Sequence, residues 1–329
     1  MSALLEIDNL QTVFSTGRGM LRAVDGVSIA LNAGEVTGVV GESGCGKTML
    51  ALSILRLIPP NGRIQTGRIV FEGTDLLSLT EAEMRQKRGS DIGMIFQEPM
   101  TSLNPVLRVG EQIAEVVMLH RGLPRKQAQD ESVRMLAEVG LPDPSRRAAD
   151  YPHQLSGGMR QRVMIAIAMS CHPKLLLADE PTTALDVTVQ AQILDLMAQL
   201  QKKNDMAVML ITHDLGVVAR MAHRVAVMYA GRIVELAAAS DLFENPLHPY
   251  TKGLIESRPS ACGNISSDNL KLKTIAGTVP SLYALPEGCR FSDRCDFASE
   301  ACRQKEPDLL EVRTNHSVAC VLHQKKIAG

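Results

Sequence analysis

The stretch "GESGCGKT", residues 41–48, decides the fold class of this 329-residue chain. It fits the pattern G-x4-G-K-[ST] and lies between "EVTGVV", typical of a buried strand, and "KTMLALSILRLI", typical of a helix. Glycines at positions 41, 44 and 46 let the backbone curl so that its N–H groups can point at phosphate oxygens. The start of the following helix adds a positive dipole end. These eight residues therefore predict a site for a nucleoside triphosphate at a strand–loop–helix junction.

The residue types of this loop match the chemistry of a phosphate site. The Lys47 ammonium can meet the β- and γ-phosphates, and the Thr48 hydroxyl is a hard oxygen ligand for Mg²⁺. Cys45 needs only to be small at its position. We predict that the nucleotide-binding residues of the loop are Gly41, Ser43, Gly44, Cys45, Gly46, Lys47 and Thr48.

A second apolar run, "KLLLADEP" at residues 174–181, ends in two carboxylates. Asp179 at a strand end can hold the Mg²⁺ shell, and Glu180 can polarise a water for in-line attack. An acidic pair at a strand end can also be a plain solvated turn. The phosphate loop in the same chain favours the catalytic interpretation.

Strand-like and helix-like segments alternate around these two motifs. The pattern predicts strands at residues 4–10, 26–31, 35–41, 68–73, 92–97, 174–179 and 207–212, with helices at 47–58 and 187–203. This alternation predicts an α/β fold built on a mostly parallel sheet. Residues 98 to about 171 have apolar positions three and four apart, which predicts a helical block inserted into the sheet domain. From about residue 259 the tail is irregular and rich in Pro, Ser and Cys.

The composition narrows the class of protein. The chain has 35 Lys and Arg against 36 Asp and Glu, a balance that gives no support for a general nucleic-acid binder. The N-terminus "MSALLEIDNL" does not have the order of a secretory signal, and the longest apolar run is "VMIAIAMSC". A membrane span needs roughly 18–20 apolar residues. We therefore expect a cytoplasmic chain whose seven cysteines are reduced.

The stretch "LSGGMRQR", residues 155–162, gives the family resemblance. It resembles the signature of ATP-binding-cassette (ABC) ATPases, and the resemblance covers residues 4–258. Gln97 at the end of a predicted strand, "ALD" at residues 184–186 and "ITHD" with His213 at the end of another occur in the order of that family. The resemblance implies a P-loop NTPase (ABC ATPase) core with an inserted α-helical subdomain, binding ATP and Mg²⁺.

The resemblance also implies roles for single residues around the γ-phosphate. Catalysis and contact with the attacking water are assigned to Glu180, His213 and Gln97. The Mg²⁺ ion is assigned to Thr48, Asp179 and Gln97.

Other implied roles concern the partner subunit and the adenine. In this family the signature of one subunit covers the nucleotide of its neighbour, a role that falls here on Ser156, Gly157 and Gly158. Asp186 belongs to the D-loop, and Phe14 is our choice for the aromatic that stacks on adenine.

Longer segments resemble the oligopeptide/dipeptide/nickel-type importer ATPases. They are "FQEPMTSLNPVLRVGEQI" (96–113), "YPHQLSGGMRQRVMIA" (151–166), "NPLHPYTKGLIESRP" (245–259) and the Cys-rich tail. The resemblance implies an ABC nucleotide-binding domain at 1–258 with its helical subdomain at about 98–171, and a C-terminal extension at 259–329. Residues 98–105 are expected to line a groove for a membrane subunit.

We therefore expect an ATP-hydrolysing subunit that energises a peptide importer. The expected partners are a second, non-identical ATPase subunit, two membrane-spanning permease subunits and an extracytoplasmic binding protein. The expected location is the cytoplasmic face of the inner membrane, as a peripheral subunit. Nickel, glutathione or another small solute stays open as the cargo, and a soluble ATPase acting on nucleic acid is the alternative from another class.

Four cysteines of the tail form a candidate metal site: Cys289, Cys295, Cys302 and Cys320. The numbers of residues between them, five, six and seventeen, are wider than the spacing usual in zinc fingers. Four thiolates suit a structural zinc or an iron–sulfur cluster, with chance clustering as the alternative and His316 and His323 as substitute ligands. The resemblance favours a [4Fe–4S] cluster that orders the tail, and zinc stays open.

Overall fold

The structure is a computed structural model that describes residues 3–98, 102–183, 185–257 and 274–324. The chain divides into two compact units. Unit 1 comprises residues 1–4, 31–35 and 78–210, and unit 2 comprises residues 5–30, 36–77 and 211–329. The expected groove segment 98–105, the "ALD" stretch and the expected extension from residue 259 fall partly outside the described residues.

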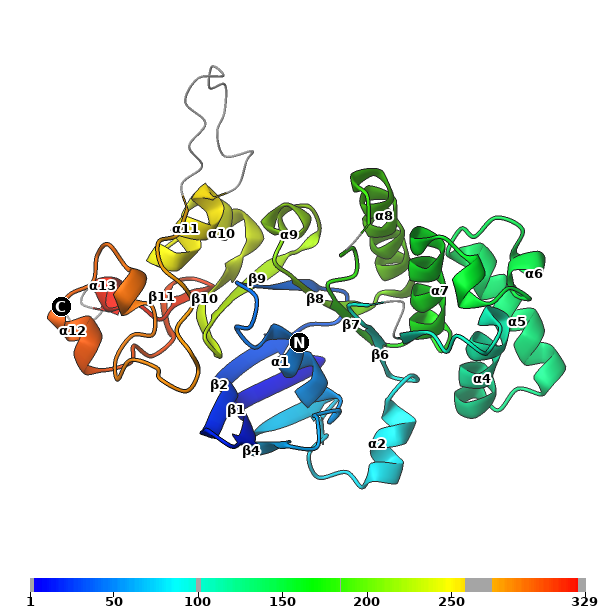
Figure 1. The fold of residues 1–329 in the computed structure, drawn as a ribbon, viewed down its shortest axis with the longest axis horizontal. Coiled ribbons are helices and arrows are strands. Elements are labelled where there is room, and N and C mark those ends of the chain that lie inside the picture. Colours follow the sequence, from blue (N-terminus) through cyan, green and yellow to red (C-terminus); the bar gives the residue numbers. More distant parts are fainter. Residues whose placement is uncertain (1–2, 99–101, 184, 258–273, 325–329) are drawn as a thin grey trace, which may run out of the picture. The chain divides into compact units, whose positions relative to one another are not determined.

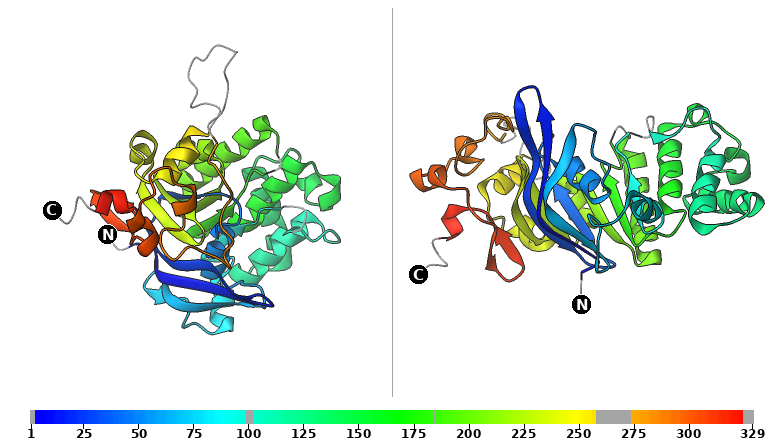
Figure 2. Two further views of the ribbon diagram at one scale, coloured as in Figure 1. Left: turned by 60° about the vertical axis from the view of Figure 1, so that its left-hand side comes forward. Right: turned by 90° about the horizontal axis from the view of Figure 1, so that it is seen from below.

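Unit 2 begins with a four-stranded antiparallel sheet in the order β2-β1-β4-β5. Its strands are β1 (Leu5–Thr16), β2 (Gly19–Leu31), β4 (Gly62–Phe71) and β5 (Thr74–Asp75). The blue strands β1, β2 and β4 run alongside one another, with Leu5 of β1 opposite Phe71 of β4 (Figures 1 and 2). The sequence prediction of a mostly parallel sheet is wrong here. The two-residue connection between β1 and β2 is long enough only for a hairpin, which makes the pair antiparallel.

A second set of strands in unit 2 carries the phosphate loop. In spatial order these are β11 (Leu310–Arg313), β12 (His316–Val318), β10 (Arg232–Ala238), β9 (Arg224–Tyr229) and β3 (Val36–Val40). Strand β3 is parallel to β9, as predicted for the strand that precedes the loop, while β9, β10, β12 and β11 pair antiparallel. The tail is thus not irregular throughout, because β11 and β12 extend this sheet.

Unit 2 also contains helices, several of which contact these strands. They are α1 (Lys47–Ile54), α9 (Leu215–Met221), α10 (Ala239–Glu244), α11 (Pro249–Glu256), α12 (Glu300–Gln304) and α13 (Val321–Gln324), with a 3₁₀ turn η3 (Ser292–Arg294). The predicted helix after the loop is present and ends at Ile54. The apolar core of the unit joins β3 and β9 to the tail, since Val40, Val227, Tyr229, Tyr250 and Phe291 belong to one buried cluster.

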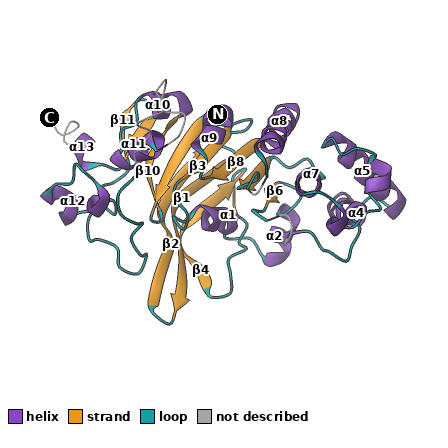
Figure 3. Ribbon diagram, turned by 45° about the horizontal axis from the view of Figure 1, so that its top comes forward, coloured by secondary structure: helices purple, strands orange, loops and turns teal. Residues whose placement is uncertain are grey.

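Unit 1 holds the acidic strand and the helices of the predicted insertion. Strand β6 (Ile92–Ile95) is parallel to β7 (Leu175–Asp179), and β8 (Ala207–Thr212) starts in this unit. The helices are α2 (Glu81–Lys87), α4 (Val109–Arg121), α5 (Arg125–Glu138), α6 (Pro144–Arg147), η1 (Pro152–Gln154), α7 (Gly157–Met169) and α8 (Val187–Asn204). The described residues from 102 to 171 form helices and turns without a strand. Helices α4, α5 and α7 contact one another, as the purple helices of Figure 3 illustrate.

Candidate functional site

The loop "GESGCGKT" joins β3 to α1 in unit 2 and leaves the start of the helix open. Gly46 is the residue before the first turn, with φ of 105°, and no side chain caps the helix. The first turn also has no acidic residue. Because uncapped N–H groups at a helix start favour an anion, this end of α1 suits a phosphate.

Two glycines of the loop are required by close backbone contacts. A Cβ on Gly41 would lie 2.2 Å from the Met228 carbonyl oxygen, and one on Gly46 would lie 2.2 Å from the Ala23 carbonyl oxygen. Both neighbours are backbone atoms of strands, which cannot move aside cheaply. The sequence therefore needs glycine at these positions to let β2 and β9 approach the loop.

The Lys47 side chain folds back over the preceding residues of the loop. Its Nζ donates to the carbonyl oxygens of Gly41, at 2.8 Å, and Glu42, at 3.0 Å, and its side chain is buried. Cys45 lies beneath it, fully buried, and burial raises the pKa of its thiol although the Lys47 charge opposes that rise. The ammonium is therefore held inside the loop, where the phosphates would bind, and Cys45 acts as a small packed residue.

The acidic strand end in unit 1 holds Glu180 in a fixed position. Asp179 is buried at the end of β7, and Glu180 follows with φ of 45°, in the left-handed region. The Gln97 amide Nε2, two residues beyond β6, donates to Glu180 Oε2 at 3.0 Å. The Thr183 hydroxyl donates to the same oxygen at 2.8 Å. Parallel pairing of β6 with β7 brings Gln97 to Glu180, and the strained backbone at Glu180 is typical of functional residues.

The signature and the D-loop lie next to each other in unit 1. Ser156 is exposed and caps α7 by accepting a hydrogen bond from the Met159 N–H at 3.4 Å. Asp186 caps α8 by accepting from the Val189 N–H at 2.9 Å. A Cβ on Gly158 would lie 2.7 Å from Val189 Cγ1, so glycine allows the start of α7 to pack on the start of α8. The start of the signature helix thus presents the Ser156 hydroxyl and Gly157 to the exterior.

Two further predicted residues lie in unit 2. His213 is exposed directly after β8, and Asp214 caps α9 by accepting from the Gly216 N–H at 2.7 Å. Phe14 lies on β1 beside Gly62 of β4, where a Cβ on Gly62 would come within 2.6 Å of the Phe14 ring. Its contact with adenine stays a prediction.

Comparison with known proteins identifies the family. A family model described as ABC transporter matches residues 24–183, and one described as oligopeptide/dipeptide transporter, C-terminal region, matches residues 234–302. The chain is 50% identical to the oligopeptide transport ATP-binding protein AppD of Bacillus subtilis, over 99% of this chain and 98% of that protein. The chain belongs to the ATP-binding subunits of oligopeptide/dipeptide-type ABC transporters.

Other relatives and a solved structure agree with this family. A putative peptide import ATP-binding protein of Brucella melitensis is 51% identical, with 98% of each chain covered. The dipeptide transport ATP-binding protein DppD of Bacillus subtilis is 48% identical over 99% of this chain and 96% of that protein. The ATP-binding cassette MJ0796, in a dimeric structure bound to ADP and Pi, matches with a TM-score of 0.65 and 26% identity, covering 71% of this chain and 98% of that one.

Family membership fixes the activity and the kind of assembly. The chain is an ABC ATPase, and an ATP-binding subunit of this kind implies membrane permease partners, an ATPase partner and a peripheral place at the membrane. Among the described residues, no helix has the length and apolar character of a membrane span.

The four cysteines of the ABC subunit's tail line one hollow. Cys289, Cys295, Cys302 and Cys320 all face it, together with apolar residues that include Phe291, Phe297, Pro307 and Leu322. Burial raises the pKa of the Cys289 thiol to about 12 and that of Cys320 to about 11. In the described part of the chain, no three His, Cys, Asp or Glu side chains lie close enough to hold one metal ion. The chain therefore gathers the thiols around a common space without converging them on one point.

The two histidines named as substitute ligands have other partners. His316 Nε2 lies 2.7 Å from Glu235 Oε1, with both side chains buried, and His323 Nε2 lies 3.1 Å from the Leu247 carbonyl oxygen. Burial by itself would raise the pKa of Glu235, but hydrogen bonds with His316 and from two backbone N–H groups hold that pKa below its usual value. His316 therefore ties β12 to β10.

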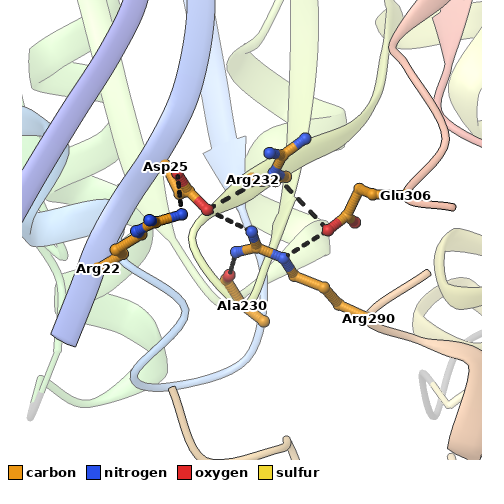
Figure 4. A network of polar contacts seen from close by, with 6 residues as sticks. All are labelled: Arg22, Asp25, Ala230, Arg232, Arg290 and Glu306. Atoms are coloured by element: carbon orange, nitrogen blue, oxygen red, sulfur yellow. Dashed lines mark hydrogen bonds and ion pairs between the residues drawn. The ribbon is translucent and has the colours of Figure 1, made fainter. Parts of the chain in front are cut away.

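A buried charge network holds the tail of the ATPase subunit to the strands beside the phosphate loop. Arg290, 7% exposed, pairs with Asp25, donates to the Ala230 carbonyl oxygen at 2.5 Å and donates to Glu306 at 2.9 Å (Figure 4). Arg232 lies 3.8 Å from Asp25 and 3.9 Å from Glu306. Sequence analysis missed this network, because its members are up to 265 residues apart and no local pattern relates them.

Proposed function

We propose that this ABC ATPase hydrolyses ATP to power the import of peptides. The relatives named for oligopeptide, dipeptide and peptide import cover nearly the whole chain, which supports a peptide as the cargo. The observation that carries the proposal is the hydrogen-bonded arrangement of Gln97, Thr183 and Glu180 at the strand ends, which suits a carboxylate that directs a water. Nickel, glutathione and other small solutes are the alternative cargoes of the same machine.

In this proposal the phosphate loop binds the nucleotide and the strand end supplies the chemistry. Lys47 and the open start of α1 meet the phosphates, while Thr48 and Asp179 hold Mg²⁺ with the help of Gln97. Glu180 takes or orients the proton of the attacking water, and His213 contacts the γ-phosphate. Lys47→Ala should weaken nucleotide binding itself, whereas changes at Glu180 should affect turnover.

We also infer that Ser156, Gly157 and Gly158 act on the nucleotide of an ATPase partner, with Asp186 beside them. The exposed Ser156 hydroxyl and the start of α7 can face a γ-phosphate from outside the subunit, which supports this role. A non-identical partner ATPase, two permeases and an extracytoplasmic binding protein complete the proposed importer. Its closed dimer must be favoured by ATP and released after hydrolysis.

A reconstitution experiment tests this function. The subunit, its genomically neighbouring permeases, partner ATPase and binding protein are assembled in vesicles, and uptake of labelled di- and oligopeptides is measured with MgATP on the outside. We expect uptake that needs ATP and the binding protein, and that competes with unlabelled peptide but not with nickel or glutathione. Uptake of nickel or glutathione alone would overturn the peptide assignment.

A single substitution tests the role of the signature. Ser156→Arg should reduce hydrolysis at the partner's nucleotide and leave the binding of MgATP to this subunit's own loop intact. Photolabelling of each subunit with an azido-ATP, together with turnover, distinguishes the two sites. Full activity of the isolated chain as a strict monomer would contradict the shared-site proposal.

We further propose that Cys289, Cys295, Cys302 and Cys320 bind a [4Fe–4S] cluster. All four thiols line one mostly apolar hollow, and cysteine thiolates are the ligands that such a cluster takes. In a four-iron cluster each thiolate binds a different iron, so the sulfurs need not converge on one point as they must around zinc. A bound metal also favours the thiolate form that burial disfavours at Cys289 and Cys320. When bound, the cluster supplies four iron–sulfur bonds that join separate segments of the tail.

Metal analysis of the purified full-length chain tests the cluster. Protein prepared without oxygen should be brown, absorb broadly at about 400 nm and contain about four irons per chain. Cys302→Ser should lose most of the iron, whereas Cys171→Ser, at a half-buried cysteine outside the hollow, should keep it. Colourless protein with one zinc per chain would favour zinc, and metal-free protein with a folded tail would refute both.

A further inference from the structure

The second residue of the phosphate loop is an acid that is paired with the tail of the chain. Arg294 donates from Nη1 to Glu42 Oε2 at 2.7 Å and from Nη2 to Glu42 Oε1 at 3.0 Å, across 252 residues of sequence. The Arg294 side chain is 5% exposed and that of Glu42 is 30% exposed. Two parallel hydrogen bonds between a planar guanidinium and a carboxylate fix both groups in orientation as well as distance.

The backbone of Glu42 is also hydrogen-bonded, to a residue of the aromatic cluster that surrounds Arg294. Its N–H donates to the Tyr250 hydroxyl at 2.8 Å, and Tyr250 is fully buried. Tyr250 packs against Tyr229 and Phe291, with ring centroids 4.6 and 5.4 Å away. The Arg294 guanidinium lies 5.8 Å from the ring centroids of both Tyr229 and Phe291. The pocket around Arg294 is therefore built from α11, β9 and the tail, and leaves the arginine little freedom.

A second arginine of the same tail segment reaches the other end of the loop. Arg290 donates to the carbonyl oxygen of Ala230, and the next residue, Gly231, donates its N–H to the Cys45 carbonyl oxygen at 2.9 Å. Arg290 directly follows Cys289, and Arg294 directly precedes Cys295. The segment 289–295 thus contacts both halves of the loop, directly at Glu42 and through the Ala230–Gly231 turn at Cys45.

The charge of Glu42 explains why the loop needs such a partner. The Glu42 carbonyl oxygen accepts from Lys47 Nζ, so this residue forms part of the loop that receives a polyphosphate. An unpaired carboxylate there would repel the phosphates and would offer Lys47 or Mg²⁺ a competing anion. Arg294 cancels that charge and turns the carboxylate toward the tail.

We propose that Arg294 is a positioning residue for ATP binding, which neutralises Glu42 and makes the tail of the chain part of the nucleotide site. By linkage, a tail that holds the loop in its ATP-binding form is itself stabilised when ATP binds. This inference concerns the ATPase activity and does not depend on which metal, if any, the four cysteines bind.

A double-mutant cycle on the full-length chain tests the proposal. The dissociation constant for MgATP is measured by calorimetry for wild type, Arg294→Gln, Glu42→Gln and the double variant. Arg294→Gln should weaken MgATP binding on the order of tenfold, because it leaves the Glu42 charge unpaired. The double variant should return to within about threefold of wild type, because the repelling charge is also gone. Lys305→Gln is the matched control, since Lys305 forms an exposed ion pair with Asp308 at 3.2 Å in the same tail.

The cycle separates charge neutralisation from simple support of the fold. If Arg294 only props up the loop, the double variant should bind MgATP as weakly as Arg294→Gln, and that result overturns the proposal. An unchanged dissociation constant in Arg294→Gln overturns it as well. The defect of Arg294→Gln should also shrink as salt is raised from about 50 to 500 mM, which loss of support would not produce. Should Arg294→Gln fail to fold, Glu42→Gln decides alone, because weaker MgATP binding than wild type contradicts the proposal.

Discussion

Two carboxylates of the ATPase subunit, Glu42 in the phosphate loop and Glu180 at the end of β7, have partners of different kinds. Glu42 accepts two hydrogen bonds from the guanidinium of Arg294, a full positive charge. Glu180, within its own unit, accepts from the neutral amide of Gln97 and the neutral hydroxyl of Thr183. A cation cancels the negative charge of its partner, whereas neutral donors orient a carboxylate and leave its charge in place. Arg294 therefore cancels the charge of the first acid, whereas Gln97 and Thr183 orient the second, as our proposal for Glu180 requires.

The backbone differs between the two acids in the same sense. Glu180 has a φ of 45°, in a region that residues with a side chain rarely adopt, while Glu42 is outside that region. Strain of this kind persists where the surrounding structure holds it and is typical of functional sites. The comparison predicts that the same substitution, Glu to Gln, lowers turnover at position 180 but mainly changes MgATP binding at position 42.

The largest expected effect is at Glu180. Glu180→Gln keeps the size of the side chain and its hydrogen bonds from neutral donors, but it loses the charge that directs the water. ATP hydrolysis should fall by about 100-fold or more while MgATP binding is retained, as measured in an assembly whose other site is also disabled. Near-normal hydrolysis in that assembly would remove Glu180 from the catalytic role.

A third carboxylate, Glu235, sharpens the comparison because it is fully buried. His316→Ala removes the group bonded to Glu235 Oε1 at 2.7 Å and leaves a buried acid with fewer donors. The free energy of unfolding in denaturant should fall by about 2–3 kcal/mol. Arg313→Ala, at an exposed position on the neighbouring strand β11, should change it by less than about 0.5 kcal/mol. Equal effects of the two substitutions would show that the buried His316–Glu235 pair does not stabilise the fold more than an exposed side chain does.

The pKa of Glu235 gives the pH dependence of that contribution. Its pKa is held below the ordinary value of 4.5 in the folded chain, so the unfolded chain binds more protons than the folded chain below that pH. The stability contributed by Glu235 is therefore present above pH 4.5 and is lost as the pH falls through the folded pKa. In Glu235→Gln, the free energy of unfolding should therefore fall less steeply as the pH is lowered through that range. An unchanged pH profile would show that Glu235 does not contribute this pH dependence.

A smaller effect is expected from the hydroxyl beside Glu180. Thr183→Val keeps the shape of the side chain and removes the donor that lies 2.8 Å from Glu180 Oε2. Because a hydrogen bond to a charged group contributes about 1.5 kcal/mol or more, hydrolysis should fall about tenfold. Thr183→Ser retains the donor and should stay close to wild type. A Val variant as active as the Ser variant would leave Gln97 as the residue that orients Glu180.

The smallest expected effect is at Glu42. Glu42→Gln removes the neutralised charge and leaves the Arg294 cation beside the loop, so MgATP binding should tighten by about threefold. Turnover should change far less than in Glu180→Gln. Steady-state kinetics with varied ATP, which separate KM from kcat, measure both effects. A loss of turnover as large as that of Glu180→Gln would erase the distinction between the two acids.

The sequence by itself predicted the parts of the site that short segments encode. The strand, loop and helix around residues 41–48, the acidic end of β7 and the helix that starts after Ser156 follow from periodicity, glycine positions and caps within windows of a few residues. The family resemblance carried by "LSGGMRQR" likewise agrees with the matched family models. Such features can be predicted because their hydrogen bonds and burial depend on residues nearby in the chain.

Only the tertiary structure decided how distant segments pair. Periodicity does not distinguish the antiparallel β2-β1-β4-β5 sheet from a parallel one, and the tail gave no strand signal strong enough to predict β11 and β12. The Arg294–Glu42 pair and the common hollow of four thiols also depend on which surfaces meet after folding. A single residue in a sequence fixes what chemistry it can offer. Its partner is fixed by the burial of shared apolar surface, here around Tyr229, Tyr250 and Phe291, that places two remote segments in contact.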